Sequence, residues 1–261
     1  ATAGFELVHA NGGIKAGGRG VIARSFFGAP MGYNDTIDFT GGNRPGPILH
    51  VIDNVFMGSD DDILDFDSTD AWVEGNIFMH AHRNGSPDSA SAISGGSDNA
   101  DTSQVTIIGN IIYDCDHAAL AKQGNFYTMI NNTVVHQTRA GGTEPVAGVI
   151  IMADPGTTEG AGFHLEGNIL HDIENLVMNQ TAAAITFTNN LMDLPWSGPG
   201  GGNFSADPRF NYVPQVFETT NFTTWQQAQV MKDWLGLDGG SPARGLGGVI
   251  PLGVSISGEP E

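Results

Sequence analysis

The chain has 261 residues, and its 29 acidic against 10 basic side chains give a formal net charge of −19 at neutral pH. A charge of this sign and size repels phosphate backbones and anionic lipid headgroups, so nucleic acid and membrane surfaces are not expected as partners. No run reaches the roughly 18 consecutive apolar residues of a membrane span, and Cys115 is the single cysteine, which excludes an intrachain disulfide.

One short pattern, an apolar pair, an Asn and a second apolar pair, recurs along the chain, as in VEGNIF at 73–78. Ser25 takes the Asn position in an earlier copy, GRGVIARSFFG. The Asn residues follow one another at steps of 22, 34, 22, 36 and 22 and are Asn54, Asn76, Asn110, Asn132, Asn168 and Asn190. Self-similarity of this kind indicates a solenoid, in which each unit buries its apolar face against its neighbours.

The composition of the repeats decides between the classes of solenoid. Short β-branched runs and 37 glycines disfavour helical repeats, and the leucine spacing of leucine-rich repeats is missing. We predict an all-β fold, a single-stranded right-handed parallel β-helix of about seven coils over residues 1–196. The repeated Asn is then a corner residue that bonds its copies above and below and tolerates the left-handed backbone of a tight corner.

The two enlarged steps, at 80–101 and 136–162, are expected to be loops that carry a binding surface. After Asn190 a segment rich in Pro and Gly is expected to end the repeat. Residues 197–261 should form an irregular tail. Its one short helix, at about 223–236, should be capped by Thr224 with Gln227 and pack on the coil.

The repeated GNIF-type turns, followed by ADPRF at 206–210 and GSPARGLG at 240–247, resemble right-handed parallel β-helix proteins of the pectate-lyase-like superfamily. The ending VIPLGVSISGEPE resembles a junction in large secreted bacterial proteins that carry spore-coat-kinase-like and lamin-tail domains. This resemblance implies a secreted or cell-surface bacterial module whose partners include neighbouring domains of a parent protein. The superfamily contains polysaccharide lyases, hydrolases and non-catalytic adhesins, so the activity has to be inferred from individual residues.

The start of the chain agrees with a module taken from a longer protein. ATAGFELVHANGG has no basic leader followed by an apolar run, and nothing like a cap precedes the first repeat. An uncapped coil end exposes strand edges, so end-to-end self-association is a further expectation.

Acidic and imidazole side chains recur at fixed distances from the repeated Asn. Six residues after it come Asp60, His82 and Asp116. Four residues after it come Gly58, His80 and Asp114. Residues two apart in a strand share a face, so two polar columns are expected on one side of the coil.

These columns suit the binding of a polysaccharide and its hydrolysis. Inverting glycosidases hold two carboxyl groups about 6.5–9.5 Å apart, and Asp60 and Asp116, two coils apart, should meet roughly that spacing. The SDDD run at 59–62 also resembles the paired-Asp motif of polygalacturonase-type hydrolases, whose Gly-His-Gly and Arg-x-Lys motifs this chain lacks. The expected catalytic residues are Asp60, Asp62, Asp65, His82, Asp116 and Lys122. The expected substrate-binding residues are His80, Arg83, Asp114 and His117.

Three alternatives stay open. Calcium takes six to eight oxygen ligands and is the one cofactor expected, with no organic cofactor. Its expected ligands are Asp60, Asp61, Asp65, Asp67, Asp98 and Asp101. A calcium-dependent lyase would need Lys122 or Arg83 near a polyuronate, which the net charge repels unless calcium bridges it. A non-catalytic structural or adhesion module would use the same acidic face only as a solvated surface.

Overall fold

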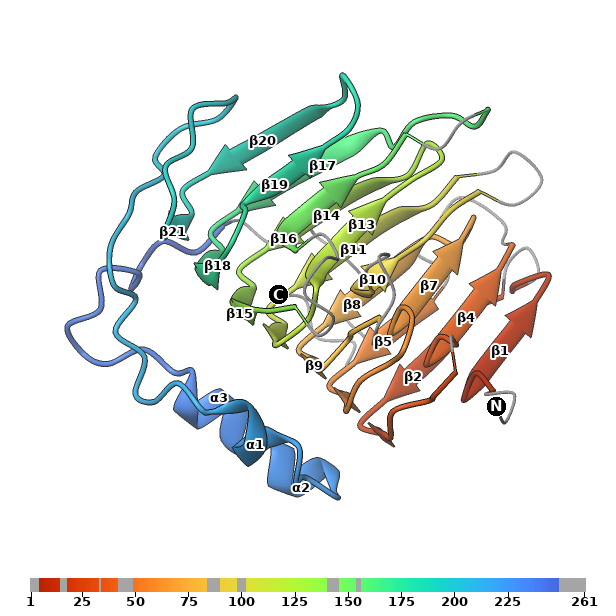
Figure 1. The fold of residues 1–261 in the computed structure, drawn as a ribbon, viewed down its shortest axis with the longest axis horizontal. Helices are drawn as coiled ribbons and strands as arrows, with labels where there is room; N and C mark the ends of the chain where they lie inside the picture. Colours follow the sequence, from red (N-terminus) through yellow and green to blue (C-terminus); the bar gives the residue numbers. More distant parts are fainter. Residues whose placement is uncertain are drawn as a thin grey trace.

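The computed structural model in Figure 1 is a parallel β-helix, as the repeats predict. It describes residues 5–14, 18–32, 34–41, 49–83, 90–97, 102–139, 146–153 and 156–248. The strands form three sheets of seven parallel strands, here named A, B and C, and each of the seven coils adds one strand to each sheet.

The three sheets take their strands in a fixed order along the chain. Sheet A consists of β1 (Val8–Asn11), β4 (Ile37–Thr40), β7 (Leu64–Asp67), β10 (Ser91–Ser94), β13 (His117–Ala121), β16 (Ala147–Ile151) and β19 (Val177–Asn179). Sheet B consists of β2 (Gly20–Ala23), β5 (Leu49–Ile52), β8 (Ala71–Glu74), β11 (Gln104–Ile108), β14 (Phe126–Ile130), β17 (Gly162–Glu166) and β20 (Ala184–Thr188). Sheet C consists of β3 (Phe26–Phe27), β6 (Val55–Phe56), β9 (Ile77–Met79), β12 (Ile111–Tyr113), β15 (Thr133–Gln137), β18 (Ile169–Ile173) and β21 (Leu191–Met192).

The enlarged steps are not loops throughout. Strand β10 lies inside 80–101 and β16 lies inside 136–162, because every coil must supply a strand to sheet A. Both strands consist of small and apolar residues that are fully or nearly fully buried. The segments SAIS and AGVII are buried strands, although they lie in stretches expected to be loops.

The core lies between the three sheets, and in-register stacking fills it. The inward Ile37 of β4 pairs with Leu64 of β7, which pairs with Ile93 of β10, so apolar side chains lie directly above one another. The rings of Phe27, Phe56 and Phe78 stack in the same way, with successive centroids 4.9 Å apart. Cys115 is fully buried in this core.

A ladder of buried asparagines joins the coils at the corner between sheets B and C. Each Asn donates its backbone N–H and its side-chain Nδ2 to the Oδ1 of the next Asn, as Asn110 does to Asn132 at 2.9 and 3.0 Å. The same Nδ2 also donates to a strand carbonyl of the preceding coil, which for Asn110 is that of Val73. Ser25 begins the ladder by donating its amide to Asn54, as its position in the first repeat predicts.

The left-handed backbone at this corner belongs to the residue before each Asn rather than to the Asn itself. These preceding residues have φ between 50° and 73° and are Arg24, Asp53, Gly75, Gly109, Asn131, Gly167, Asn189 and Gly202. The expectation that the ladder Asn adopts this conformation is therefore wrong. Glycine adopts positive φ at no steric cost, which explains the recurring Gly-Asn dipeptides.

The ladder also continues one step beyond its expected end at Asn190. Asn203 accepts hydrogen bonds from the backbone N–H and the Nδ2 of Asn190 at 2.9 and 3.0 Å, and Phe204 pairs with Leu191. The step is shorter than 22 residues because this last turn adds no strand to sheets A and B. The stretch GGNFSA carries Gly-Asn followed by an apolar residue, as do the rungs at Asn76, Asn110 and Asn168.

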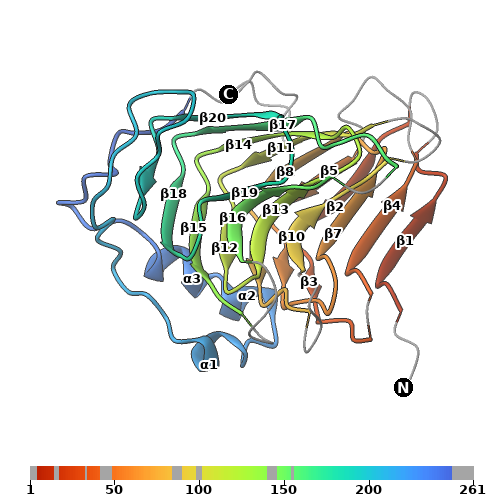
Figure 2. The same cartoon turned by 45° about the horizontal axis from the view of Figure 1, so that its top comes forward.

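Three short helices lie along the outer face of sheet C, as Figures 1 and 2 show: α1 (Val216–Thr219), α2 (Trp225–Ala228) and α3 (Val230–Trp234). Within the expected range 223–236 the chain thus forms two helices, and α1 was not expected. The Thr224 hydroxyl accepts the amide of Gln227, whereas the Gln227 side chain accepts from Thr223 instead of completing the expected capping box. No helix in the described residues is long and apolar enough to cross a membrane.

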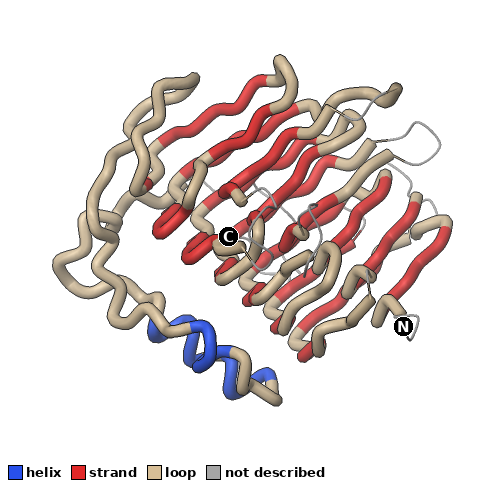
Figure 3. Tube along the Cα trace, viewed as in Figure 1, coloured by secondary structure: helices blue, strands red, loops and turns tan. Residues whose placement is uncertain are grey.

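Apolar side chains of α2 and α3 cover the outward residues of sheet C, and Figure 3 shows this helical segment beside the strands. Polar contacts fix its position. The Tyr113 hydroxyl donates to the Pro214 carbonyl at 2.6 Å, and the Trp225 indole donates to the Asp53 carbonyl at 2.6 Å. Lys232 adds an ion pair with Asp53 at 2.8 Å. Tyr113, Trp225 and Lys232 therefore hold the segment on the coil.

We expect Asn132→Ala to lower the free energy of unfolding by about 3 kcal/mol, because it leaves buried amide and carbonyl groups of neighbouring coils without partners. Urea denaturation measures the change. The matched control is Asn11→Ala, at an exposed position at the end of β1, which should stay within about 0.5 kcal/mol of the parent chain. Equal effects of the two substitutions would show that the ladder does not stabilise the fold.

Candidate functional site

Two polar columns run along the corner between sheets C and A, at the positions that the spacing predicts. Four residues after the ladder Asn, the backbone is left-handed in four successive coils, at His80, Asp114, His136 and Asp172. His80 Nδ1 bonds to Asp114 Oδ2 at 2.7 Å, and His136 bonds to Asp172 in the same way. In the second column His82 Nδ1 bonds to Asp116 Oδ1 at 2.7 Å.

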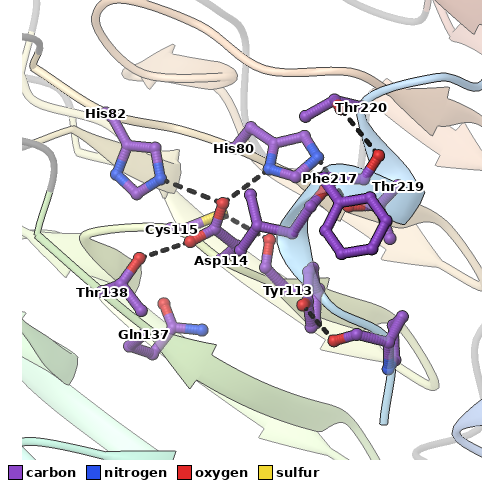
Figure 4. A network of polar contacts seen from close by, with 12 residues as sticks. His80, His82, Tyr113, Asp114, Cys115, Gln137, Thr138, Phe217, Thr219 and Thr220 are labelled. Atoms are coloured by element: carbon purple, nitrogen blue, oxygen red, sulfur yellow. Dashed lines mark hydrogen bonds and ion pairs between the residues drawn. The ribbon is translucent and has the colours of Figure 1, made fainter. Parts of the chain in front are cut away.

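His80, Asp114 and Thr219 form a chain of contacts like that of a hydrolytic triad (Figure 4). Nε2 of His80 lies 3.0 Å from the hydroxyl of Thr219 in α1, and Nδ1 faces Asp114. The Thr219 side chain is fully buried, and its hydroxyl donates to the Val216 carbonyl at 2.8 Å. A buried hydroxyl that donates within its own helix is not an available nucleophile. This chain of contacts anchors α1 to the coil.

His82 is held between two carboxylates. Its Nδ1 faces Asp116 at 2.7 Å and its Nε2 faces Asp114 at 3.3 Å. Burial alone would lower the pKa of His82, but the hydrogen bonds and charges of Asp114 and Asp116 outweigh it and raise the pKa to about 9. At neutral pH His82 is therefore an imidazolium, so it cannot serve as a general base.

Asp114 is the acceptor that joins both columns. Burial would raise its pKa, but hydrogen bonds from His80 and His82, the charge of His82 and a bond from Thr138 bring the pKa far below the usual range. The carboxylate stays ionised and fully engaged. Asp114 and His80 are expected to bind substrate, but the polar atoms of both side chains are engaged in these contacts.

The two residues of the expected catalytic pair, Asp60 and Asp116, lie in different surroundings. Asp116 is fully buried and accepts the amides of Arg83 and Ala90 in addition to His82. Asp60 instead faces the cavity described below, where one of its oxygens accepts the amide of Gly32 at 2.8 Å. The geometry of the turn, which spacing alone does not reveal, directs Asp116 inward.

A second acidic cluster lies where the strands of sheet A begin. Carboxylate oxygens of Asp35, Asp62 and Asp65 all lie within 4.8 Å of one another. Burial and the nearby charges of Asp62, Asp65 and Asp61 raise the pKa of Asp35 to about 9. Burial also raises the pKa of Asp65, against the opposing charge of Lys122. Three carboxylates this close cannot all ionise, so the cluster holds at least one proton at neutral pH.

Asp35 was not among the expected site residues. It lies two residues before Ile37, as Asp62 lies two residues before Leu64, and these two apolar residues pair in register. The amide of Asp62 donates to Asp35 at 3.0 Å, and Asp62 Oδ1 accepts the amide of Ser91 at 2.7 Å. The similarity between IDFT at 37–40 and LDFD at 64–67 is the sequence signal that would have aligned the two carboxylates.

Two basic side chains lie at the edge of this cluster. Arg83 forms an ion pair with Asp61, whose pKa burial and Asp62 raise to about 6 although Arg83 opposes the shift. Burial would lower the pKa of Lys122, but the surrounding charges of Asp65, Asp62, Asp67 and Asp35 raise it above its usual range. Both side chains therefore carry a positive charge at neutral pH.

Several polar atoms beside the cluster have no hydrogen-bond partner within the described part of the chain. They include Oδ1 of Asp65 and the hydroxyl of Ser94, which lies next to Asp65 in sheet A and is fully buried. His117 is fully buried as well, and burial lowers its pKa to about 4. Asp67 accepts the amide of Gly96, while Asp98 and Asp101, two expected calcium ligands, lie outside the described residues.

A cavity of about 620 Å³ lies between the coil and the C-terminal segment. Phe26, Met57 and Asp60 contribute to its wall from the coil, and Phe222 and Thr223 contribute from the segment between α1 and α2. Asp60 and Asp62 are separated by a single residue, so the cavity and the acidic cluster adjoin along the chain. The docked C-terminal segment forms one wall of the cavity, so the spacing of the repeats could not predict the cavity.

We expect the His82 imidazole to titrate near pH 9 in NMR spectra, with His82→Gln identifying its signals by their loss. This pKa lies above the 6.5 of an unperturbed histidine, so the pairing stabilises the fold fully below about pH 6.5. The contribution is then lost as the pH rises through about 9, and the variant should lack this loss. A His82 signal that titrates at 6.5 or below would contradict the network.

Compared with protein-family models, curated proteins and solved structures, the chain gives no match in any of the three.

Proposed function

We propose that this protein binds a polysaccharide on the outer face of sheet A and hydrolyses it with the cluster of Asp35, Asp62 and Asp65. One observation carries the proposal: three carboxylates lie within 4.8 Å, and the pKa of one is raised to about 9. Glycoside hydrolysis needs a protonated carboxyl group beside an ionised one, and such a cluster supplies both at neutral pH.

Asp35 is the proposed general acid because it retains its proton at neutral pH. It would protonate the glycosidic oxygen as the bond from that oxygen to the anomeric carbon breaks. Asp62 is the proposed partner carboxylate, since the amide of Ser91 fixes the position of its Oδ1 beside Asp35. Burial, together with the nearby charge of Asp62, keeps the proton on Asp35.

The spacing of the carboxylates bears on the stereochemistry of the reaction. Separations of about 5–5.5 Å are typical of retaining enzymes, whereas inverting enzymes leave about 6.5–9.5 Å for a water molecule. A separation within 4.8 Å favours direct attack by Asp62 on the anomeric carbon, followed by hydrolysis of the covalent intermediate. The proposed outcome is retention, in place of the inversion expected for Asp60 and Asp116.

The charge state of the basic residues disfavours the lyase alternative. β-Elimination needs a neutral base to remove a proton from the sugar ring. Lys122 is held as an ammonium by the carboxylates around it, and Arg83 is paired with Asp61. Neither side chain is available as a base, so hydrolysis is the better fit to this cluster.

The resemblance to the pectate-lyase-like superfamily supports a polysaccharide as the ligand. It rests on the GNIF-type turns and on the ADPRF and GSPARGLG segments, and the parallel β-helix agrees with it. The SDDD run at 59–62 includes Asp62 of the proposed cluster. With the acidic composition, these features favour a secreted or cell-surface bacterial protein.

We expect Asp35→Asn and Asp62→Asn each to lower the rate of reducing-end release from a susceptible polysaccharide at least 100-fold, since each removes a reacting carboxyl group. Asp172→Asn, at an exposed position near the other end of the coil, is the matched control and should retain the parent rate. Activity should fall as the pH rises through about 9, where Asp35 loses its proton. The assay covers a panel of neutral and uronic polysaccharides.

Full activity of Asp35→Asn would contradict the assigned acid. Absence of cleavage of every polysaccharide in the panel would contradict the hydrolase and favour the structural or adhesion module.

Cation binding by the same cluster is the second candidate. Asp65 Oδ1 and the Ser94 hydroxyl lack hydrogen-bond partners in the described part of the chain, and oxygen ligands of this kind suit calcium. The ligand set would be Asp35, Asp62 and Asp65 rather than the predicted set that included Asp60, Asp67, Asp98 and Asp101.

If calcium binds here, isothermal titration calorimetry should detect one site whose affinity falls at least tenfold in Asp65→Asn and is unchanged in Asp172→Asn. The removal of one carboxylate ligand from a three-carboxylate site is the physical reason for the loss. No heat of binding at millimolar calcium, or equal affinity in both variants, would rule the site out.

A further inference from the structure

The cavity between the coil and the C-terminal segment has an apolar floor, and its free polar side-chain atoms are hydrogen-bond acceptors. Phe26, Met57 and Phe222 are partly buried and pack against the apolar layer beneath the helices. The ring of Phe222 also contacts Trp234, with centroids 6.2 Å apart, which fixes its orientation. Preformed sites with apolar walls and a few fixed polar groups are typical of small-ligand binding.

The hydroxyl and carboxylate groups of the cavity present acceptors. Asp60 uses one oxygen to accept from Gly32, and its other oxygen has no partner within the described chain. The Thr220 hydroxyl donates to the Phe217 carbonyl at 3.1 Å, and the Thr223 hydroxyl donates to Gln227 at 2.9 Å. Each threonine therefore has only lone pairs left for a ligand.

The side-chain donors of the cavity are already used. The ring nitrogens of His80 contact Asp114 and Thr219, and both ring nitrogens of His82 contact carboxylates. A ligand carboxylate would meet acceptors and no free side-chain donor in the described wall, so a uronate is disfavoured.

We infer that this cavity is a binding subsite for a neutral saccharide, whose hydroxyl groups donate to Asp60, Thr220 and Thr223 while the C–H face of a ring packs on Phe222. The inference rests on the proposed function and names its substrate class. Asp60 in the cavity and Asp62 in the cluster are separated only by Asp61, so one chain of sugars could occupy both places.

The test measures binding of neutral hexasaccharides (cello-, xylo-, manno- and maltohexaose) and of hexagalacturonate to the full chain by calorimetry. Phe222→Ala removes the stacking surface, and Phe217→Ala, an exposed aromatic in the same segment, is its control. Gly28→Leu fills the cavity from the coil side, because a Cβ at Gly28 meets no atom within 4 Å. Gly201→Leu, equally open but remote, is the control for added bulk.

The expected result is binding of at least one neutral hexasaccharide, weakened at least tenfold by Phe222→Ala and by Gly28→Leu and unchanged by both controls. Hexagalacturonate should not bind at the cavity. Binding that is equal in all four variants, or lost only for hexagalacturonate, would overturn the subsite.

The two proposals fail in distinguishable ways. If polysaccharide is cleaved but the cavity variants bind and cleave like their controls, the subsite is wrong and the hydrolase stands. If the cavity variants lose binding while no polysaccharide is cleaved, the subsite stands and the hydrolase is wrong. If none of the hexasaccharides binds, the subsite is overturned. The hydrolase is then tested separately, by comparing reducing-end release from polysaccharide by the parent chain and by Asp35→Asn.

Discussion

The buried asparagine ladder fixes the register of the whole coil, and every other feature of the structure depends on that register. Each amide exchanges hydrogen bonds with the coils on both sides, so a coil displaced by one residue would bury amide and carbonyl groups without partners. A one-residue slip would also turn each apolar side chain to the opposite face of its sheet. The ladder therefore determines which side chains lie above one another at every corner.

This constraint explains which parts of the site could be predicted. The columns of His80 with Asp114 and of His82 with Asp116 follow from equal distances to the ladder, and the structure brings both pairs into contact. Spacing says nothing of how far a turn residue points inward, which is why the burial of Asp116 could not be foreseen. Asp35 lies ten residues after Ser25 whereas Asp62 lies eight after Asn54, so equal spacing from the ladder does not align the two carboxylates.

The same contrast holds for the fold. The repeat period and the apolar pairs were enough to predict a parallel β-helix of about seven coils, and the structure has seven coils that form three sheets. They did not place the left-handed residue of the corner, which depends on backbone geometry, or the last rung at Asn203, whose step departs from the period. The docking of α1 to α3 on sheet C rests on contacts between residues more than 100 apart in the chain, such as Tyr113 with Pro214.

The stacking of the coils also places acidic side chains in two different environments. At the corner between sheets C and A, carboxylates contact the ring nitrogens of histidines from adjacent coils. At the start of sheet A, the stacking of coils instead holds Asp35, Asp62 and Asp65 together against their mutual repulsion. Such an arrangement costs stability locally, and sites where the scaffold maintains unfavourable charges are characteristic places for catalysis.

The most direct test of the proposed chemistry is mass spectrometry of products formed from polysaccharides in water enriched in ¹⁸O. The account predicts oligosaccharides with one ¹⁸O atom at each new reducing end, and none from the Asp35→Asn variant. Unsaturated products without ¹⁸O, or no soluble products from any polysaccharide, would contradict it.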